Sequence, residues 1–224
     1  MGQVVWRQFD KAIAKYRYTN RATDKSYPKG FAERLMEQVN AMADLRLTTQ
    51  MYQYFKKTCP WLKETYLQWL RGFRYNPTQV KAWQNDDGSL EIEIEGPWFE
   101  TIYWEVPLLY IITQLSRTSA NGIQNPMVSN WREKIMEKGQ RLFDAGVNWI
   151  DFGTRRRASF EVQDAVCEIM KRWRPDAVST ESQNIGFDGA GKSFTSGTGT
   201  HVHPTTGVFR GTSNPFLGMR HDLT

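Results

Sequence analysis

Hydrophobic side chains recur every three or four residues over 31–45, and this spacing predicts an amphipathic helix. The apolar positions are Phe31, Leu35, Val39 and Met42. Glutamate, arginine and glutamine side chains fill the positions between them, so one face is expected to pack on a core. Two shorter apolar and aromatic segments follow, at 51–55 and 64–70. The first runs into Cys59-Pro60, where proline would break a continuing helix.

Residues 79–83 and 90–95 carry the pattern of a β-hairpin. Leu90, Ile92 and Ile94 alternate with three glutamates, which predicts a strand with one buried face. The connecting residues, 85–88, read Asn-Asp-Asp-Gly, a composition typical of a turn. The next segment, 98–115, is too long and too apolar for a strand. It predicts one mostly buried helix that Pro107 disturbs.

The second half of the chain predicts a strand between two helices. Apolar positions place a helix at 128–143, with Gly146 as its expected end. Residues 147–152 form a short strand candidate, followed by a basic turn and a second helix. That helix carries an apolar side made of Val162, Val166, Ile169 and Trp173. A strand, loop and helix in this order make the βα unit of an α/β fold.

More than half of residues 178–207 are Gly, Ser or Thr, so this stretch is expected to be a flexible insertion without a hydrophobic face. Order is expected to resume at 208–210, and no further helix or strand pattern follows before Thr224. The chain is therefore expected to stop short of a complete fold.

Composition changes this picture little. The 224 residues are enough for one large or two small domains, and 24% charged residues is ordinary for a globular protein. The net charge of +5 suits phosphorylated ligands or nucleic acid without selecting either. Two cysteines, Cys59 and Cys167, make no disulfide framework, which favours the cytoplasm. We find no secretory signal, and the longest nearly apolar stretch, 106–112, is far shorter than a membrane span.

The densest chemical signal is DFGTRRR at 151–157, because it follows the predicted strand, where α/β folds place ligand sites. Three adjacent arginines offer guanidinium groups for a carboxylate or phosphate. A solvated helix start with surface arginines is the plainer structural interpretation.

DFGTRRR and the string FRGTSN at 209–214 together resemble the paired signature of nicotinate phosphoribosyltransferases. Further strings occur in the family's order: RYTNR from Arg17, LRLTTQMYQYF from Leu45, FRYNP from Phe73, and the block that begins LEIEIEGPWFE. The resemblance covers residues 1–173 and 208–224 and leaves the insertion unmatched. It implies an N-terminal α/β domain at 1–120 and, at 121–224, the first βα units of an irregular α/β barrel. It also implies a homodimer whose active sites include both subunits.

The resemblance also implies a set of substrate-binding residues. They are Phe152, Thr154, Arg155, Arg156, Ser213 and Asn214. In the family pattern, Phe152 stacks on the pyridine ring, and a core phenylalanine is the alternative. Arg155 corresponds to a basic residue near the ring's acid group or the phosphates, whereas Arg157 suits the surface equally well. The neutral Ser213 favours nicotinate over nicotinamide, because an acidic side chain there would repel the carboxylate.

The family joins nicotinate to phosphoribosyl pyrophosphate, releases nicotinate mononucleotide and pyrophosphate, and uses Mg²⁺ and ATP in NAD biosynthesis. Its phosphorylated histidine segment would follow Thr224, and His221 lies in a different sequence context, so we assign no catalytic residue here. The alternative hypothesis is a non-catalytic remnant, or the N-terminal half of a split enzyme that needs a second chain.

Other motifs favour structural interpretations. Residues 186–193 fit the phosphate-loop pattern G-x-x-x-x-G-K-S, but no strand or helix pattern flanks them. His201 and His203 have no neighbouring Cys or carboxylate, so we predict no metal site. A basic nucleic-acid-binding module is a weaker hypothesis, because Trp98, Trp104, Trp131 and Trp173 fall on expected core faces.

Overall fold

The computed structural model describes residues 1–21, 26–118, 130–175, 186–187, 193–194 and 206–223. The chain divides into two compact units. The first unit comprises Met1–Pro126 and Thr154–Ser159, and the second comprises Met127–Gly153 and Phe160–Thr224. Residues 154–159 belong to the first unit although the segments on both sides belong to the second, and the sequence did not predict this. The predicted domain division at 120 stays a prediction.

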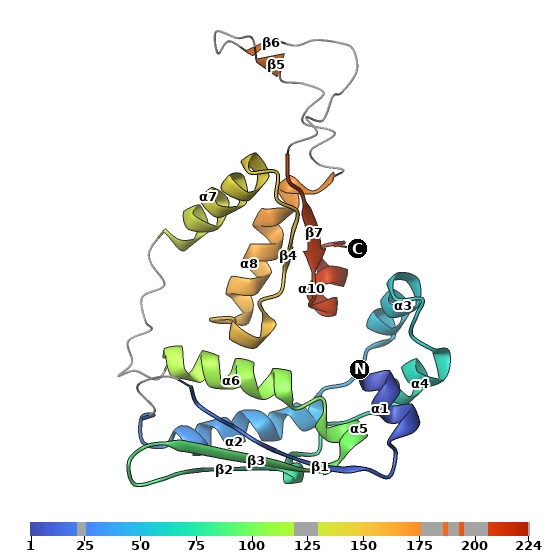
Figure 1. Ribbon diagram of the computed structural model, residues 1–224, viewed down its shortest axis with the longest axis vertical. Helices are drawn as coiled ribbons and strands as arrows, with labels where there is room; N and C mark the ends of the chain where they lie inside the picture. Colours follow the sequence, from blue (N-terminus) through green and yellow to red (C-terminus); the bar gives the residue numbers. More distant parts are fainter. Residues whose placement is uncertain (22–25, 119–129, 176–185, 188–192, 195–205, 224) are drawn as a thin grey trace. The chain divides into compact units, whose positions relative to one another are not determined.

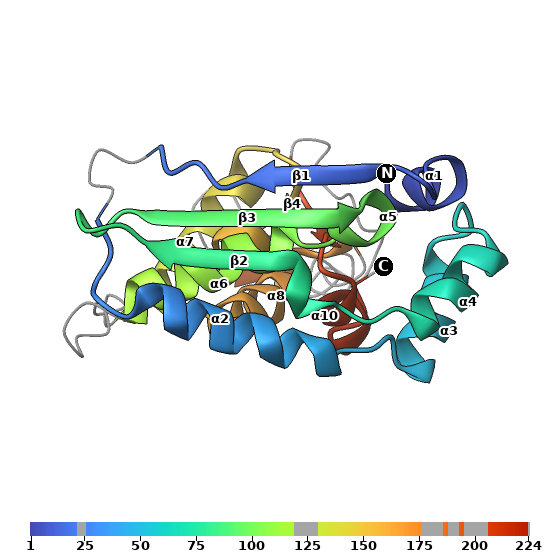
Figure 2. The ribbon, with the colours of Figure 1, turned by 90° about the horizontal axis from the view of Figure 1, so that it is seen from below.

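A three-stranded antiparallel sheet forms the centre of the first unit. Its strands are β1 (Ile13–Arg17), β2 (Val80–Gln84) and β3 (Leu90–Pro97), in the order β1-β3-β2. Figure 2 shows the three strands from below, with α2 (Phe31–Ala41) running beside β2. The predicted β2–β3 hairpin is confirmed, with Val80 opposite Ile94 and Gln84 opposite Leu90. Gly88 closes its turn at a φ of 80°, a conformation that favours glycine.

One face of this sheet carries the hydrophobic core of the first unit. The alternating residues Leu90, Ile92 and Ile94 are all buried, as predicted. They pack under α2 and α6 (Glu105–Thr118), which lie on the same side of the sheet in Figure 1. The α2 residues Phe31 and Leu35 are both fully buried, so the predicted amphipathic helix is confirmed. A 3₁₀ turn, η1 (Met42–Asp44), continues it.

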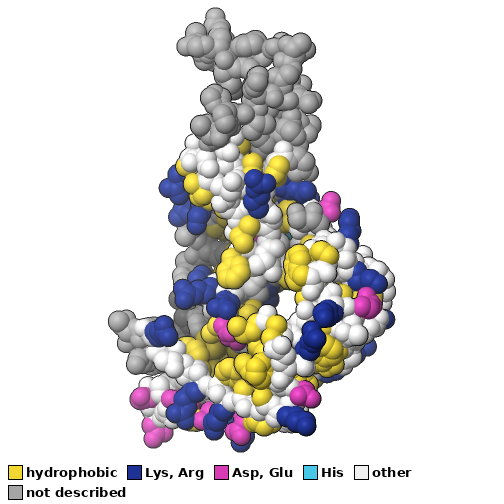
Figure 3. Space-filling model, turned by 45° about the vertical axis from the view of Figure 1, so that its right-hand side comes forward, with side chains coloured by type: hydrophobic (Ala, Val, Ile, Leu, Met, Phe, Trp, Pro, Cys, Tyr) yellow, Lys and Arg dark blue, Asp and Glu magenta, His cyan; other side chains and the backbone are white. Residues whose placement is uncertain are grey.

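The opposite face of the sheet is charged. Lys15 and Arg17 on β1 pair with Glu93 on β3, at 3.2 Å and 2.8 Å. Figure 3 shows basic and acidic side chains intermixed along the lower surface of the molecule, where this sheet lies. The alternation of apolar and acidic residues in β3 therefore separates a core face from a solvent face.

The long apolar segment after β3 forms two helices where we predicted one. A short helix, α5 (Trp98–Thr101), ends before a turn that contains Trp104, and α6 then begins at Glu105. Pro107 lies at the third position of α6, where a missing N–H breaks no helical hydrogen bond, so it marks a helix start. Trp104 is fully buried in the turn, and its indole N–H donates to Gln79 Oε1 at 3.1 Å.

Several elements of the first unit lacked a clear sequence pattern. α1 (Gly2–Gln8) and β1 were not predicted. Two predicted apolar segments are the helices α3 (Thr49–Thr58) and α4 (Glu64–Gly72), and η2 (Pro77–Gln79) leads into β2. No helix in the described parts of the chain has the length and hydropathy needed to cross a membrane.

The second unit is built on two parallel strands, β4 (Trp149–Asp151) and β7 (Phe209–Thr212). Figure 1 shows α7 (Trp131–Asp144), α8 (Phe160–Met170) and α10 (Pro215–Arg220) grouped around them. The predicted strand–loop–helix unit is therefore present, with η3 (Thr154–Arg156) in its loop and η4 (Lys171–Trp173) after α8. α10 had no sequence prediction.

The predicted apolar side of α8 is confirmed in part. Trp173 is buried, and the half-buried Val166 and Ile169 pack against the same core, whereas Val162 is half-buried without being part of it. The most deeply buried positions are instead Gln163, Ala165, Cys167 and Met170. Hydrophobic periodicity identifies the apolar side of a helix from its hydrophobic residues alone. It therefore missed the polar Gln163, which can be buried because its amide forms hydrogen bonds.

Only fragments of the glycine-, serine- and threonine-rich segment are described. Gly186–Phe187 and Ser193–Phe194 form the short antiparallel strands β5 and β6. A phosphate loop needs a helix after its lysine and serine, and β6 occupies that position instead. Residues 178–185, 188–192 and 195–205 of the predicted flexible insertion, with His201 and His203, lie outside the described residues.

Candidate functional site

The C-terminal ends of β4 and β7 lie next to each other in the second unit. Ser213 N–H donates to the backbone carbonyl of Asp151 at 2.8 Å, which extends the strand pairing beyond β7. Phe152 is the next residue after Asp151. Two of the sequence-predicted residues, Phe152 and Ser213, therefore lie at the same end of one parallel strand pair.

Phe152 is an exposed aromatic side chain. Its side chain is 73% exposed, so the alternative of a core phenylalanine is wrong. Burying such a ring against a flat ligand would remove apolar surface from water. Ile150, two residues earlier on the strand, is also 54% exposed.

The Asp151 carboxylate connects three parts of this site. Its Oδ1 accepts from the Gly153 N–H at 3.1 Å. Its Oδ2 accepts from Gln163 Nε2 on α8 at 2.9 Å and from the Thr212 hydroxyl on β7 at 2.7 Å. Asp151 and Gln163 were not singled out from the sequence. The signal that could have found Gln163 is a polar residue on the core side of α8.

Asn214 has a structural role at the start of α10. Its Oδ1 accepts from the N–H groups of Phe216 and Leu217, at 3.1 Å and 3.3 Å, which caps the helix. Its Nδ2 donates to Gln163 Oε1 at 3.4 Å. The adjacent Ser213 is exposed. In this turn, the Ser213 side chain is therefore exposed to solvent, while the Asn214 side chain caps the first turn of α10.

The three remaining predicted residues belong to the first unit. Thr154, Arg155 and Arg156 form η3, which packs on α6. The Arg155 guanidinium pairs with Glu105 at 2.9 Å, and its backbone carbonyl accepts from the Thr113 hydroxyl at 3.4 Å. Both side chains of the ion pair are half-exposed, so the pair is weak and solvent-screened. The ligand-binding roles of these residues stay predictions.

Cys167 lies beside the Asp151 cluster but does not have the properties of a nucleophile. Burial, together with the neighbouring Asp151 carboxylate, raises the pKa of the Cys167 thiol to about 12. A thiol with this pKa is neutral at physiological pH and unreactive. His221 is also engaged, since its Nε2 lies 2.7 Å from Asp164 Oδ1. Within the described ranges, no three His, Cys, Asp or Glu side chains gather closely enough to hold a metal.

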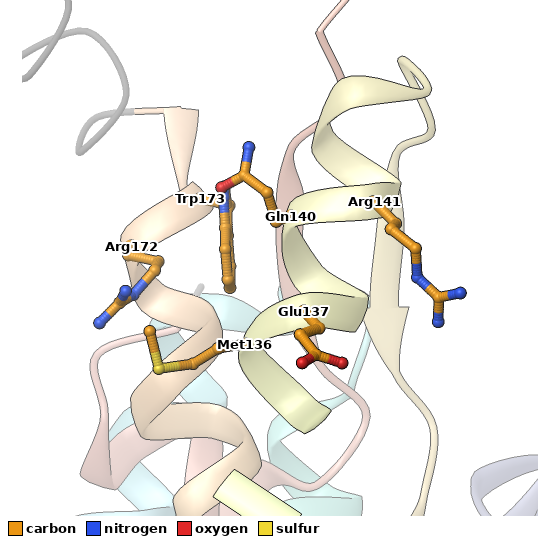
Figure 4. A pocket seen from close by; sticks show the side chains of 6 residues that line it. All are labelled: Met136, Glu137, Gln140, Arg141, Arg172 and Trp173. Carbon is orange, nitrogen blue, oxygen red and sulfur yellow. The ribbon is translucent and has the colours of Figure 1, made fainter. Parts of the chain in front are cut away.

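A hollow lies between α7 and η4, with a volume of about 590 Å³. Its lining residues are Met136, Glu137, Gln140, Arg141, Arg172 and Trp173. Figure 4 shows the Trp173 ring between the two helices, while the Arg141 and Arg172 side chains extend outward, away from it. The charged groups do not converge on the hollow, so it lacks the arrangement of a binding site.

Comparison with known proteins decides the family. The family model described as the nicotinate phosphoribosyltransferase N-terminal domain matches residues 1–113 of the 224, half of the chain. The chain belongs to the nicotinate phosphoribosyltransferase family. The family expected from the sequence resemblance is thereby confirmed.

Individual nicotinate phosphoribosyltransferases support this membership. That of Chromohalobacter salexigens is 37% identical over 206 residues, covering 91% of this chain and 50% of the relative. That of Yersinia enterocolitica is 39% identical over 178 residues, covering 77% and 43%. The crystal structure of the Porphyromonas gingivalis enzyme superimposes with a TM-score of 0.78 and 25% identity, covering 99% of this chain and 48% of the other. The α/β fold class is confirmed, and the chain spans about half the length of these relatives.

Proposed function

We propose that the chain serves the nicotinate phosphoribosyltransferase reaction of NAD biosynthesis by providing the nicotinate-binding end of β4 and β7. In this reaction, the pyridine nitrogen of nicotinate attacks the anomeric carbon of phosphoribosyl pyrophosphate and pyrophosphate leaves. The observation that carries the proposal is the exposed Phe152 ring, located at a strand end beside the Ser213 turn in a member of this family.

The chemistry of this strand end suits a flat aromatic acid. The exposed face of Phe152 offers an apolar surface for stacking on the pyridine ring. Ser213 contributes an uncharged hydroxyl, which can donate a hydrogen bond to a carboxylate without repelling it. Such positioning lowers the barrier of a two-substrate reaction by holding the reactants in place.

The family also implies Mg²⁺ and ATP. The described residues contain no cluster of three metal-ligating side chains, and Mg²⁺ is commonly held through substrate phosphates and water. We therefore propose Mg²⁺ only as an ion carried by the pyrophosphate substrate, and ATP as the family's energy source. Neither has assigned residues in this chain.

The proposal extends to the setting of the reaction. Both cysteines are free thiols, which suits the reducing cytoplasm. The partner is a second copy of the chain in a homodimer, as in the family, or a complementary C-terminal chain.

Titration of the full chain with nicotinate tests the binding part of the proposal. We expect Phe152→Ala to weaken nicotinate binding about tenfold, because the stacking surface is lost. Val147→Ala is the matched control, since it also shortens an exposed apolar side chain, 43% exposed, two residues before β4. Equal affinities for nicotinate in Phe152→Ala and the unaltered chain would remove this ring from the site.

An activity assay tests the reaction itself. The full chain is incubated with nicotinate, phosphoribosyl pyrophosphate, Mg²⁺ and ATP, and nicotinate mononucleotide is measured. Formation of nicotinate mononucleotide supports the hypothesis that the chain catalyses the transferase reaction without a second chain. Nicotinate binding without product supports the alternative that a second chain is needed, and the absence of nicotinate binding contradicts the proposal.

A further inference from the structure

Asp151 connects the two chain segments that carry Phe152 and Ser213. One segment is the β4 loop, residues 152–153, and the other is the β7 turn, residues 212–214. The carboxylate accepts from Gly153 N–H in the first and from the Thr212 hydroxyl in the second. Asp151 itself precedes Phe152 directly, so a single side chain contacts both segments.

The contacts continue beyond the carboxylate. The Thr212 hydroxyl, which donates to Asp151, also accepts from Asn214 N–H at 3.1 Å, inside the β7 turn. Gln163 donates to Asp151 and accepts from the Asn214 side chain, which ties α8 to both segments. Gln163 is only 3% exposed, so this part of the network is shielded from water.

We propose that Asp151 is a positioning residue that fixes the β4 loop against the β7 turn, so that Phe152 and Ser213 act on one ligand. This inference rests on the proposed function, because the ligand is nicotinate. The Asp151 side chain does not itself need to contact the ligand.

The geometry favours a carboxylate at this position. Two N–H groups and one hydroxyl donate to the two oxygens of Asp151, the Cys167 thiol lies 4.0 Å from Oδ2, and an ionised carboxylate is a pure acceptor. An asparagine of the same size has one acceptor oxygen and one donor NH₂. If its NH₂ faces Gly153, it meets an N–H that can only donate. If it faces Gln163, the Gln163 amide must turn to offer its oxygen and loses the hydrogen bond from Asn214. Asp151→Asn is therefore expected to hold the β4 loop and the β7 turn together less well, although asparagine has the same shape as aspartate.

The first test measures amide hydrogen exchange by NMR on the full chain. In Asp151→Ala we expect Gly153 N–H to exchange at least tenfold faster, because its acceptor is gone. The amides of Ser213 and Asn214 should also exchange faster as the β7 turn loosens. The amides of β3 should keep their rates and so confirm that the first unit remains folded. Unchanged exchange at Gly153 overturns the proposal.

Asp164→Ala is the matched control. Asp164 is another carboxylate of the second unit, and it binds His221 and Arg220 at 2.7 Å and 3.1 Å. Its removal should leave Gly153 exchange unchanged. If both variants accelerate Gly153 equally, the effect is general loosening of the unit, and the positioning role is overturned.

A second pair of variants avoids the risk that Asp151→Ala fails to fold. Thr212→Val keeps the side-chain shape and removes the hydroxyl, so Ser213 and Asn214 amides should exchange faster while Gly153 keeps its rate. Thr212→Ser restores the hydroxyl and should restore the original exchange. Failure of Thr212→Val to move either amide contradicts the proposed connection.

Nicotinate titration separates this proposal from the proposed function. If the unaltered chain binds nicotinate, Asp151→Asn should weaken binding about tenfold, whereas Asp164→Ala should not. Nicotinate affinity equal to that of the unaltered chain in Asp151→Asn overturns the positioning role. If the unaltered chain does not bind nicotinate, the proposed function fails, and the hydrogen exchange at Gly153 still decides whether Asp151 fixes the two segments.

Discussion

Ser213 is the uncharged side chain that we propose lies near the nicotinate carboxylate. Its backbone is fixed by a hydrogen bond to Asp151, while its side chain is exposed. A negative charge about 4 Å from the nicotinate carboxylate would cost about 1 kcal/mol in water and about 4 kcal/mol at a partly screened protein surface. We therefore predict that Ser213→Asp weakens nicotinate binding about tenfold or more, measured by titration calorimetry.

The neutral ligand nicotinamide provides the control for this prediction. Ser213→Asp should leave nicotinamide affinity unchanged or improve it, because no carboxylate is present to be repelled. Ser213→Asn, which changes size without charge, should affect the two ligands alike. Equal losses for nicotinate and nicotinamide in Ser213→Asp would show that shape, not charge, is responsible.

At the scale of single residues, the sequence predicted candidate ligand-binding residues better than the residues that form hydrogen bonds with their segments. The motif letters identified Phe152 and Ser213, and the structure brings their segments together. The same letters gave Asn214 a ligand role, which stays a prediction, and they did not indicate that its carboxamide oxygen caps α10. They also gave no reason to single out Gln163, because its importance arises from a hydrogen bond to a residue 12 positions away.

The α3–α4 helix pair depends on a charged network around Glu64. The Tyr52 hydroxyl donates to this carboxylate, and Lys56 and Gln68 also bind it, at 3.1 Å and 2.9 Å. These hydrogen bonds, that of Tyr52 foremost, lower the pKa of Glu64 from 4.5 to about 2. A carboxyl group with a lowered pKa in the folded state stabilises the fold when ionised.

We predict a pH-dependent stability difference between the unaltered chain and Glu64→Gln. The advantage of the unaltered chain should be fully present above about pH 4.5, the ordinary value, and be lost as the pH falls towards about 2. Urea unfolding at pH 7, 4 and 2.5 measures it. Tyr52→Phe, which removes one donor, should show a smaller difference over the same pH range. A stability difference independent of pH would contradict the role of the Glu64 charge.

At the scale of elements, helices and strands with a regular hydrophobic period were predicted correctly, and short elements without such a period were not. The alternation in β3 and the three- and four-residue spacing in α2 follow from one buried face, so both were predictable. β1 was missed because it is an edge strand of mixed composition, and most of its side chains are exposed. α10 is six residues long and begins with a cap and a proline, too short for periodicity to be detected.

At the scale of the whole molecule, the α/β class could be predicted, but the assignment of segments to units could not. The chain passes between its two units at 126–127, 153–154 and 159–160. The excursion of 154–159 depends on contacts with α6 in the first unit, including the Arg157 guanidinium, which lies 4.2 Å from the centre of the Tyr110 ring. Such pairing between distant segments leaves no periodic signal in either one.

The separate cores of the two units lead to a last prediction, on Gly139→Ala. Gly139 is buried in α7, and an added Cβ would overlap the six-membered ring of Trp173. Trp173 is 5% exposed and packs on Trp149, with ring centres 6.2 Å apart, so moving the ring away from the added Cβ would disturb this packing. Overpacking of this kind costs about 1–3 kcal/mol, which urea unfolding should detect as a lower free energy of unfolding.

The effect of Gly139→Ala should remain within the second unit, because α7 and α8 pack on each other and belong to a core distinct from that of the β1-β3-β2 sheet. Hydrogen exchange should accelerate at α8 amides and stay unchanged at Ile92 and Ile94. Gly72→Ala, at the last residue of α4 in the first unit, is the control, since no heavy atom lies within 4 Å of its added Cβ. Equal acceleration in β3 would mean that the two cores unfold as one, and the division into separately stable units would then be wrong.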